Sequence, residues 1–373
     1  MTQIKKRAKA GGFGWAVYSP LTFCIFERAR AIYNGSPSRP VHDTKDMAGI
    51  KCRGDSCGRP HGDQKNMNGK IATNILDHVI TTVSEQEFNR LASDLNTNQI
   101  TQKVFDALES LGKLQKGEMS DYHDEWVALF YSWYQPSQIN LAYSMIQSII
   151  NSTDILNEKL HIVDFGCGSL AMQFGVALAV ADTIITKNKK SITEIRIDSI
   201  DTSRAMINIG KEMWELFTKL YNQKLYNHLG PVCEIIKPNY YKDIGQAELA
   251  QSSDRWISAI HAVYDENKDD IKQSLKSLRN RFYPHVCFVS THDSKKSLLK
   301  EVWPFSSKPR KTELSLQFNG ELTKITEWRR NLNKTLSQSH GYLKIPVTWE
   351  RRDAEIWHFY SGERENRPKN LRG

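Results

Sequence analysis

The stretch LHIVDFGCGS, residues 160–169, decides the fold class. Its first half is nearly all apolar, which is typical of a strand buried on both faces of a parallel sheet. Glycines follow at positions 166 and 168, and the apolar run from Ala171 to Val180 predicts a helix directly after them. A buried strand, a glycine turn and a helix in this order predict an α/β fold.

The chain continues the same alternation beyond this turn. Amphipathic helices are predicted over residues 203–221 and around residues 271–278, where apolar side chains recur every three or four positions. Between the helices lie short apolar runs that predict strands, at residues 195–201, 232–236, 256–263 and 286–290. Strands that alternate with helices form right-handed crossovers, so we expect a doubly wound parallel sheet.

The last predicted strands are residues 343–349 and 354–360, and only four residues separate them. So short a connection allows only an antiparallel pair. Upstream of the sheet the pattern is mainly helical, with helices predicted over residues 21–33, 71–114 and 122–150. Pro136 is expected to break the third of these helices, and Ser137 to cap the part that follows.

We therefore predict a basic, partly irregular and helical N-terminal region over residues 1–120, an α/β domain over 121–360 and a basic tail over 361–373. The chain has 373 residues, of which 39% are hydrophobic and 25% charged, and this composition excludes mostly disordered and collagen-like proteins. Six irregularly spaced cysteines suggest free thiols in a reducing compartment. Without an 18-residue apolar run or a signal cleavage site, we expect a cytoplasmic protein with no membrane partner.

Positive charge gathers at the two ends of the chain. The net charge is +9, and residues 1–30 and 301–373 each contribute +5, so the part between them carries −1. Basic ends attract anionic partners, nucleic acid first. Ordinary solvated tails are the alternative, and the distribution of charge alone does not decide between them.

The glycine turn indicates a nucleoside-containing cofactor when it is combined with Asp201. Glycines let the backbone approach a ligand, and the start of the following helix offers unpaired N–H groups. Asp201 closes the second predicted strand, where a carboxylate can accept hydrogen bonds from both hydroxyls of a ribose. Ala171 stands where a dinucleotide-binding G-x-G-x-x-G turn has its third glycine. Alanine is an accepted variant there, so the spacing alone does not exclude a dinucleotide as the ligand. Asp164, however, would repel a pyrophosphate and attract an ammonium group.

With these residues the segment resembles the class I S-adenosylmethionine-dependent methyltransferases. Their first motif matches Asp164, Gly166 and Gly168, and their second matches Asp201. The resemblance implies a mostly parallel seven-stranded sheet with an antiparallel last strand, and S-adenosylmethionine as cofactor. The residues that it places at the cofactor are Asp164, Gly166, Cys167, Gly168, Asp201, Thr202, Asn239 and His261.

Three departures accompany this resemblance. Leu170 stands where the family often has a further glycine. Either Asn239 or Asp243 would take the place of the acidic residue that holds the adenine after the third strand. The Asp/Asn-Pro-Pro-Tyr/Phe tetrapeptide of amino-methylating DNA enzymes is missing, and so is the proline–cysteine pair of cytosine C5 methylation.

The end of the fourth predicted strand, residues 259–266, is the expected place for chemistry. His261 is a candidate to deprotonate the acceptor, Tyr264 to orient it and Asp265 to hold His261. The alternative makes His261 a core residue beside the cofactor. His292 and Asp293 form a second candidate pair.

Two further clusters have alternatives of their own. The aromatic residues 131–134 either cap the cofactor and bind substrate, or belong to the core. A loop with Cys52, Cys57 and His61, and with His42 nearby, is a weak zinc candidate, because four residues rather than two separate its cysteines.

The leading functional prediction is a methyltransferase that acts on nucleic acid, RNA by preference. Besides the basic ends, two motifs that we expect to be exposed favour it, Trp328-Arg329-Arg330 and Trp349-Glu350-Arg351-Arg352, because arginines beside aromatics suit phosphate contact and base stacking. A small-molecule methyltransferase with a helical lid is the second reading. A non-catalytic protein that retains the fold is the third.

Overall fold

A computed structural model describes residues 61–115, 122–132, 134–152, 159–187, 192–224, 232–246, 254–291, 296–306, 308–314, 322–339 and 354–360. The helix predicted at 21–33 and the candidate zinc ligands' side chains lie outside this description, as do His292 and Asp293. The domain boundaries at residues 120 and 360 stay predictions.

The described strands form one sheet in the order β3-β2-β1-β4-β5-β7-β6. Neighbouring strands from β3 to β5 are parallel, whereas β7 is antiparallel to both β5 and β6. The predicted mostly parallel α/β sheet with an antiparallel last strand is therefore confirmed. The strands are β1 (Lys159–Phe165), β2 (Glu194–Ile200), β3 (Ile236–Tyr241), β4 (Asp254–Val263), β5 (Val286–Thr291), β6 (Arg310–Leu314) and β7 (Ala354–Tyr360).

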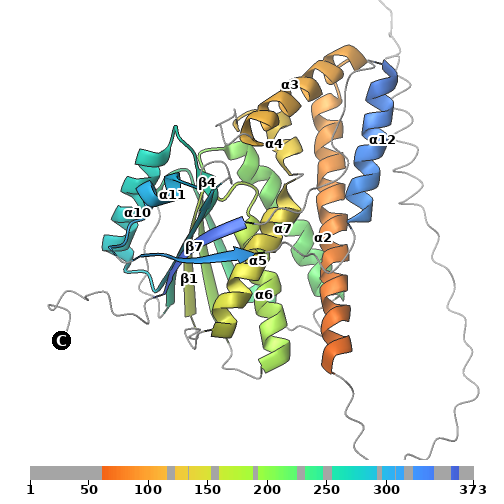
Figure 1. The fold of residues 1–373 in the computed structure, drawn as a ribbon. Helices are drawn as coiled ribbons and strands as arrows, with labels where there is room; N and C mark the ends of the chain where they lie inside the picture. Colours follow the sequence, from red (N-terminus) through yellow and green to blue (C-terminus); the bar gives the residue numbers. More distant parts are fainter. Residues whose placement is uncertain are drawn as a thin grey trace, which may run out of the picture. The chain divides into compact units, whose positions relative to one another are not determined.

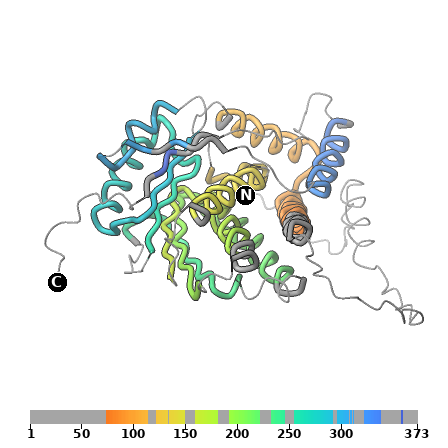
Figure 2. Tube along the Cα trace, turned by 60° about the horizontal axis from the view of Figure 1, so that its bottom comes forward, coloured from red at the N-terminus to blue at the C-terminus, as the bar shows by residue number. Residues whose placement is uncertain are grey.

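Helices cover both faces of the sheet, which is why its central strands are apolar along most of their length (Figures 1 and 2). On one side, Phe282 at the end of α10 packs edge-on against His161 of β1, with ring centroids 4.9 Å apart. On the other side, Gln173 of α6 lies 3.4 Å from the Tyr240 hydroxyl of β3. The flanking helices are α10 (Lys268–Phe282) and α11 (Leu298–Val302) on the first side, and α5 (Gln135–Ser152), α6 (Ala171–Lys187) and α7 (Arg204–Lys224) on the second.

The order of the strands reverses between β1 and β4. From β1 the chain crosses to β2 on one side, and β4 pairs with β1 on the other. In doubly wound sheets, such a switch point opens a crevice beyond the carboxyl ends of the strands, where ligands bind. Phe165 ends β1 at this edge, and the glycine turn follows it directly.

A layer of helices stands beyond α7, made of α2 (His61–Ala92), α3 (Thr97–Gln115), α4 (Glu125–Tyr131) and α12 (Thr323–Ser339). Helix α12 comes between β6 and β7 in the chain, yet it packs beside α2 (Figure 1). The buried Asp77 of α2 accepts hydrogen bonds from the backbone N–H groups of Lys324 and Ile325, at 2.8 and 3.0 Å. A side chain of one helix thus caps the N-terminus of another.

The predicted third strand was wrong in position. Residues Val232–Ile235 form the short helix α9, and β3 begins only at Ile236. A short apolar run does not distinguish a buried helical turn from a strand, and Pro238 argued against a strand at 236–241. Because β3 is an edge strand, a residue without a backbone N–H is tolerated there. A short 3₁₀ helix, Ile244–Gln246, follows it.

Two predictions near the ends of elements were also wrong. Helix α5 begins at Gln135, so Pro136 lies in its first turn and Ser137 does not cap it. Proline fits there because the first N–H groups of a helix have no intrahelical partner. At the other end of the sheet, β7 pairs with β5 on one side and with β6, Arg310–Leu314, on the other. The antiparallel partner that precedes β7 is therefore β6, and the predicted pairing with residues 343–349 was wrong. The latter residues lie outside the description.

None of the helices within the described ranges combines the length and the apolar character that crossing a membrane requires.

Candidate functional site

The turn between β1 and α6 has three residues in the left-handed region. The φ angles of Gly166, Gly168 and Leu170 are 67°, 51° and 69°. Glycine adopts this conformation without strain, whereas a leucine is held there against a strain of about 1–3 kcal/mol. Leu170 is fully buried, which fixes it in place. Leu170 therefore has a backbone conformation that glycine usually adopts.

Asp201 binds this turn directly. Its Oδ2 accepts the backbone N–H of Gly168 at 2.9 Å, and its Oδ1 accepts that of Ser203 at 2.8 Å. The N–H of Gly166 donates to the carbonyl of Ile200 at 2.8 Å. The structure thus brings together the glycine turn and the carboxylate that closes β2. Each carboxylate oxygen keeps a second lone pair for another donor.

The pKa values of both carboxylates at this edge lie above their ordinary values. Burial raises the pKa of Asp164 to about 7, and the charge of Asp201 adds to this shift. Burial likewise raises the pKa of Asp201, against the hydrogen bonds from Ser203 and Gly168. A cation placed between them would favour both charged forms. Cys167 is also buried, which raises the pKa of its thiol and disfavours the nucleophilic thiolate.

The end of β4 forms a bulge beside the glycine turn. The pairing of β4 with β5 shifts register between Ala259 and Val263, and His261, inside the bulge, has a φ of 51°. A Cβ atom built on Gly166 would lie 2.5 Å from the Cβ of Ala262. The bulge and the turn are therefore in direct contact, and His261 is next to the contacting residue. A non-glycine residue in this conformation is often found at functional sites.

Three tyrosines, Tyr122, Tyr131 and Tyr264, form what we call the tyrosine wall. The hydroxyls of Tyr122 and Tyr264 are 3.0 Å apart, and the rings of Tyr122 and Tyr131 meet edge to face at 5.8 Å. A Cβ atom on Gly168 would lie 3.3 Å from the Tyr131 ring. Burial raises the pKa of all three phenols, so they stay protonated and able to donate hydrogen bonds.

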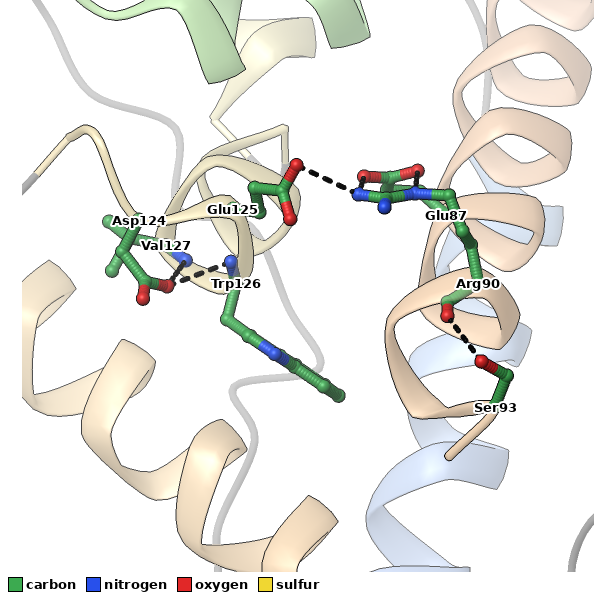
Figure 3. Close-up of polar contacts among 7 residues, drawn as sticks. All are labelled: Glu87, Arg90, Ser93, Asp124, Glu125, Trp126 and Val127. Atoms are coloured by element: carbon green, nitrogen blue, oxygen red, sulfur yellow. Dashed lines mark hydrogen bonds and ion pairs between the residues drawn. The ribbon is translucent and has the colours of Figure 1, made fainter. Parts of the chain in front are cut away.

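Helix α4 ends at Tyr131, and side-chain contacts fix its first turn (Figure 3). The Asp124 carboxylate caps its start by accepting the N–H groups of Trp126 and Val127, at 2.8 and 3.1 Å. Arg90 of α2 bridges Glu87 and Glu125, with Nη2–Oε1 distances of 2.6 and 3.0 Å. Because the Arg90 side chain is 54% exposed, this ion pair orients α4 more than it stabilises the fold.

Asn239 does not join the glycine turn. It lies inside β3, and its amide donates to Asp198 Oδ1 at 2.8 Å. Asp198 also contacts the buried His161 and Arg196, at 2.9 and 3.0 Å. Burial acts to raise the pKa of Asp198, but these three partners outweigh it and the pKa is lowered. This network joins residues inside β1, β2 and β3, short of the carboxyl edge, and its His161 ring packs against Phe282 of α10.

Asp243 follows β3 at the carboxyl edge itself. Two positions before it, the backbone carbonyl of Tyr241 accepts the N–H of Asp201 at 3.1 Å. The Asp243 side chain is exposed. Of the two residues left open for the adenine, Asp243 is the one that the structure places at the edge. Thr202 and Asp265 are exposed, each next in sequence to a residue of the site.

The prediction that Arg329 is exposed was wrong. It is 2% exposed, because it shares the buried stripe of α12 with Ile325, Leu332 and Leu336. Burial lowers the pKa of its guanidinium. Arg330, one position on, is exposed. Trp349, Arg351 and Arg352 lie outside the described residues.

Among the residues that the structure describes, no three His, Cys, Asp or Glu side chains gather as a metal site would require.

Tyr122 and Ser290 are two residues of the candidate site that the sequence did not predict. Tyr122 precedes the aromatic-rich helix α4, which was a signal, but its partner Tyr264 stands 142 positions later. A contact at that separation leaves no periodicity to detect. The Ser290 hydroxyl, which accepts the N–H of His261 at 3.1 Å, was missed for the same reason.

No family model and no characterised protein sequence matches the chain. Solved structures do, at low identity. SMU.472, a candidate methyltransferase complexed with SAH (S-adenosylhomocysteine), is 13% identical with a TM-score of 0.32 over 58% of this chain, and the match spans about half, 52%, of that protein. A candidate class I S-adenosylmethionine-dependent methyltransferase from Listeria monocytogenes is 11% identical with a TM-score of 0.34 over 80% of this chain and 90% of that one.

Coclaurine N-methyltransferase, bound to N-methylheliamine and SAH, is a third such structure. It is 12% identical, with a TM-score of 0.26, over 76% of this chain and 99% of the other. These comparisons point to no subfamily. The strand order, the antiparallel β7 and the glycine turn joined to Asp201 give this chain a doubly wound, mostly parallel, Rossmann-like sheet.

Proposed function

We propose that this protein is an S-adenosylmethionine-dependent methyltransferase. The observation that carries the proposal is the hydrogen bond from Gly168 N–H to Asp201, at the switch point of a doubly wound sheet. It places bare glycine backbone and a ribose-type acceptor at one edge. Asp164, beneath the turn, is a carboxylate that a nearby cation would ionise.

The described residues fit this cofactor by their chemistry. Any side chain at Gly166 would collide with Ala262, so this position of the turn presents backbone alone. Asp201 would accept the ribose hydroxyls, Asp164 the ammonium of the methionine part, and Asp243 the adenine amino group. When bound, S-adenosylmethionine supplies an electrophilic methyl group on a positively charged sulfur. Beyond holding it, the protein has to align an acceptor and remove a proton.

His261 and the tyrosine wall are the residues proposed for that part. An imidazole titrates near neutral pH and would take a proton from the acceptor. Tyr264 and Tyr122 stay neutral, so their hydroxyls would orient the acceptor by hydrogen bonds. Aromatic rings beside the turn would also favour a sulfonium over water, because ring faces attract cations.

For the substrate class we propose nucleic acid, with RNA preferred. The net charge of +9 and its concentration at the two ends of the chain support it. On α12, Lys324, Arg330 and Lys334 are exposed and add positive charge from the described part of the chain. The buried Arg329 contributes nothing to this surface.

A small-molecule acceptor is the second candidate, and one observation favours it. The edge that holds the glycine turn carries two carboxylates and three protonated phenols, and these groups suit a compact, neutral or cationic acceptor better than a polyanion. A protein that binds the cofactor without transferring its methyl group is the third candidate.

Asp201→Ala tests the cofactor part of the proposal. We expect the affinity for S-adenosylmethionine to fall by about 1–3 kcal/mol, because the ribose loses a charged acceptor. Asp269→Ala, an exposed aspartate of α10, is the matched control and should bind like the unchanged protein. Calorimetry on folded variants measures both. Equal affinity of all three proteins would remove Asp201 from the site, and no binding at all would end the proposal.

The acceptor is tested with labelled S-adenosylmethionine. The protein is incubated separately with total RNA, with DNA and with the small-molecule fraction of a cell extract. Label in RNA supports the first candidate and label in small molecules the second. Cofactor binding without label in any fraction supports the non-catalytic candidate.

A further inference from the structure

The bulge at the end of β4 is held by side chains rather than by the ladder of the sheet. Val263 and Thr291 resume the pairing of β4 with β5, but the residues between Ala259 and Val263 fall out of register. The backbone groups of such a bulge lose their regular partners. Three side chains from outside the bulge replace them.

Ser290 and Thr291, at the end of β5, supply two of these replacements. The Ser290 hydroxyl accepts the N–H of His261 at 3.1 Å. The Thr291 hydroxyl donates to the carbonyl of Val263 at 2.6 Å. Both side chains are buried, so water does not compete for these bonds.

Asn267 supplies the third, from the far side of the bulge. Its amide donates to the carbonyl of Ala262 at 2.9 Å and accepts the N–H of Tyr264 at 2.8 Å. Asn267 stands at the N-cap position of α10, where asparagine usually binds the first turn of its own helix, yet here it makes no such bond. Its side chain is used for the bulge instead.

The geometry points to Ser290, Thr291 and Asn267 as positioning residues, which we call the bulge clamp. They hold Ala262 against the glycine turn and keep His261 in its left-handed conformation between two fixed points. This inference rests on the proposed function, since it assigns the bulge clamp a role in placing that site. The contact that transmits the effect is Ala262 against Gly166, where no additional methyl group fits.

If the bulge clamp is loosened, the bulge relaxes toward ordinary strand geometry, because His261 escapes its positive φ. Ala262 then moves relative to Gly166, and the turn loses the surface that fixes it. Cofactor affinity falls as a result, although none of the three clamp residues belongs to the turn or to Asp201.

A pair of threonines offers a matched comparison. Thr291 Oγ1 donates to the carbonyl of Val263 at 2.6 Å, and Thr81 Oγ1 of α2 donates to the carbonyl of Asp77 at the same 2.6 Å. Both residues are buried, at 4% and 7% exposure. Thr291→Val and Thr81→Val therefore delete the same kind of bond with the same change of shape, but only one of them touches the bulge.

The experiment measures the melting temperature and the affinity for SAH, by calorimetry, for the unchanged protein, Thr291→Val, Thr81→Val and Thr291→Ser. We expect similar losses of melting temperature for the two valine variants. The affinity should fall about tenfold for Thr291→Val only. Thr291→Ser keeps the hydroxyl and should recover most of the affinity.

The outcomes separate the two proposals. If the unchanged protein binds SAH and both valine variants bind it equally well, the bulge clamp has only a structural role and the inference fails alone. If Thr291→Val does not fold, Ser290→Ala takes its place, and an affinity equal to that of Thr81→Val overturns the inference. If the unchanged protein binds neither SAH nor S-adenosylmethionine, the proposed function fails and the inference falls with it.

Discussion

Gly166 and Ala262 approach each other so closely that a side chain at position 166 would overlap the side chain of Ala262. A Cβ on Gly166 would lie 2.5 Å from the Ala262 Cβ, at a φ of 67° that L residues rarely adopt. Steric exclusion and backbone conformation thus both require glycine here. The same reasoning does not extend to Leu170, which has a positive φ and a side chain that the core accommodates.

Gly166→Ala is therefore expected to abolish measurable cofactor binding and to lower the melting temperature. Gly112→Ala is the control, because nothing lies within 4 Å of its added Cβ and it stands inside α3. That change should stabilise the protein by about 0.5–1 kcal/mol. Adding Ala262→Gly to Gly166→Ala should restore part of the binding. Normal binding by Gly166→Ala alone would mean that the turn does not hold the cofactor.

Asp164 predicts a dependence of cofactor binding on pH. Burial raises its pKa to about 7 in the free protein, so much of the carboxyl is protonated at pH 6. A bound ammonium or sulfonium favours the carboxylate, so binding at pH 6 should release a proton and the affinity should rise from pH 6 to pH 8. Calorimetry in buffers of different ionisation enthalpy measures the proton directly. Asp164→Asn should remove both effects, and an unchanged pH profile in that variant would assign them elsewhere.

The stability of the free protein should change in the opposite direction. The folded-state pKa of Asp164 lies above its unfolded value, so the folded state binds more protons between roughly pH 4 and pH 7. Stability is then greatest below that window and falls as pH rises through it. Asp164→Asn has no ionised form and should gain stability over the unchanged protein at pH 8, with the difference shrinking toward pH 5. Thermal unfolding at both pH values checks this.

At the scale of elements, α12 depends on a residue outside itself. Asp77 of α2 accepts the N–H groups of Lys324 and Ile325, and it is 3% exposed. Asp77→Ala should destabilise the protein by about 0.5–2 kcal/mol, the usual range for a lost N-cap. Asp94→Ala, an exposed aspartate beyond the end of the same helix, should have almost no effect. Urea denaturation measures both, and equal stabilities would show that α12 does not need this cap.

Elements with a strong local pattern could be predicted from the sequence. The apolar run of β1, the two glycines and the apolar α6 lie where they were expected, and so does the amphipathic α7. Residues 232–235 were misjudged because a four-residue run with three apolar residues suits either a strand or a helical turn. Strand β6, with the sequence RKTEL, has no apolar pattern because it is an edge strand.

The candidate site divides in the same way. Asp164, the glycines and Asp201 are close together in the chain or end neighbouring strands, so the sequence predicts their meeting. The tyrosine wall and the bulge clamp join residues from distant elements through side-chain geometry, which no spacing encodes. Arg329 was misjudged because its neighbours Trp328 and Arg330 suggested a surface motif. It stands four residues after Ile325 and three before Leu332, and this spacing places it on the buried face of the helix.

At the scale of the whole molecule, charge is the property that tests the substrate. Removing residues 1–9 and changing Arg330, Arg351 and Arg352 to alanine should weaken RNA binding and flatten the slope of log affinity against log salt, by roughly 0.7–0.9 per lost phosphate contact. Arg329 is left unchanged because it is buried. Affinity for S-adenosylmethionine should stay the same.

Filter binding over a series of salt concentrations, with calorimetry for the cofactor, measures both quantities. Acceptor turnover that survives these changes would retire the nucleic-acid substrate and favour a small molecule.

The position of β7 constrains the order in which the sheet is completed. This strand, residues 354–360, lies between β5 and β6, although it follows both in the chain and α12 intervenes. Until it arrives, β5 has an open edge of unpaired backbone groups, and β6 has no described neighbour to pair with. Open edges recruit other chains, and pairings between distant segments form slowly. The edge of β5 is therefore covered only once this seven-residue strand has been inserted, and until then another chain could pair with it.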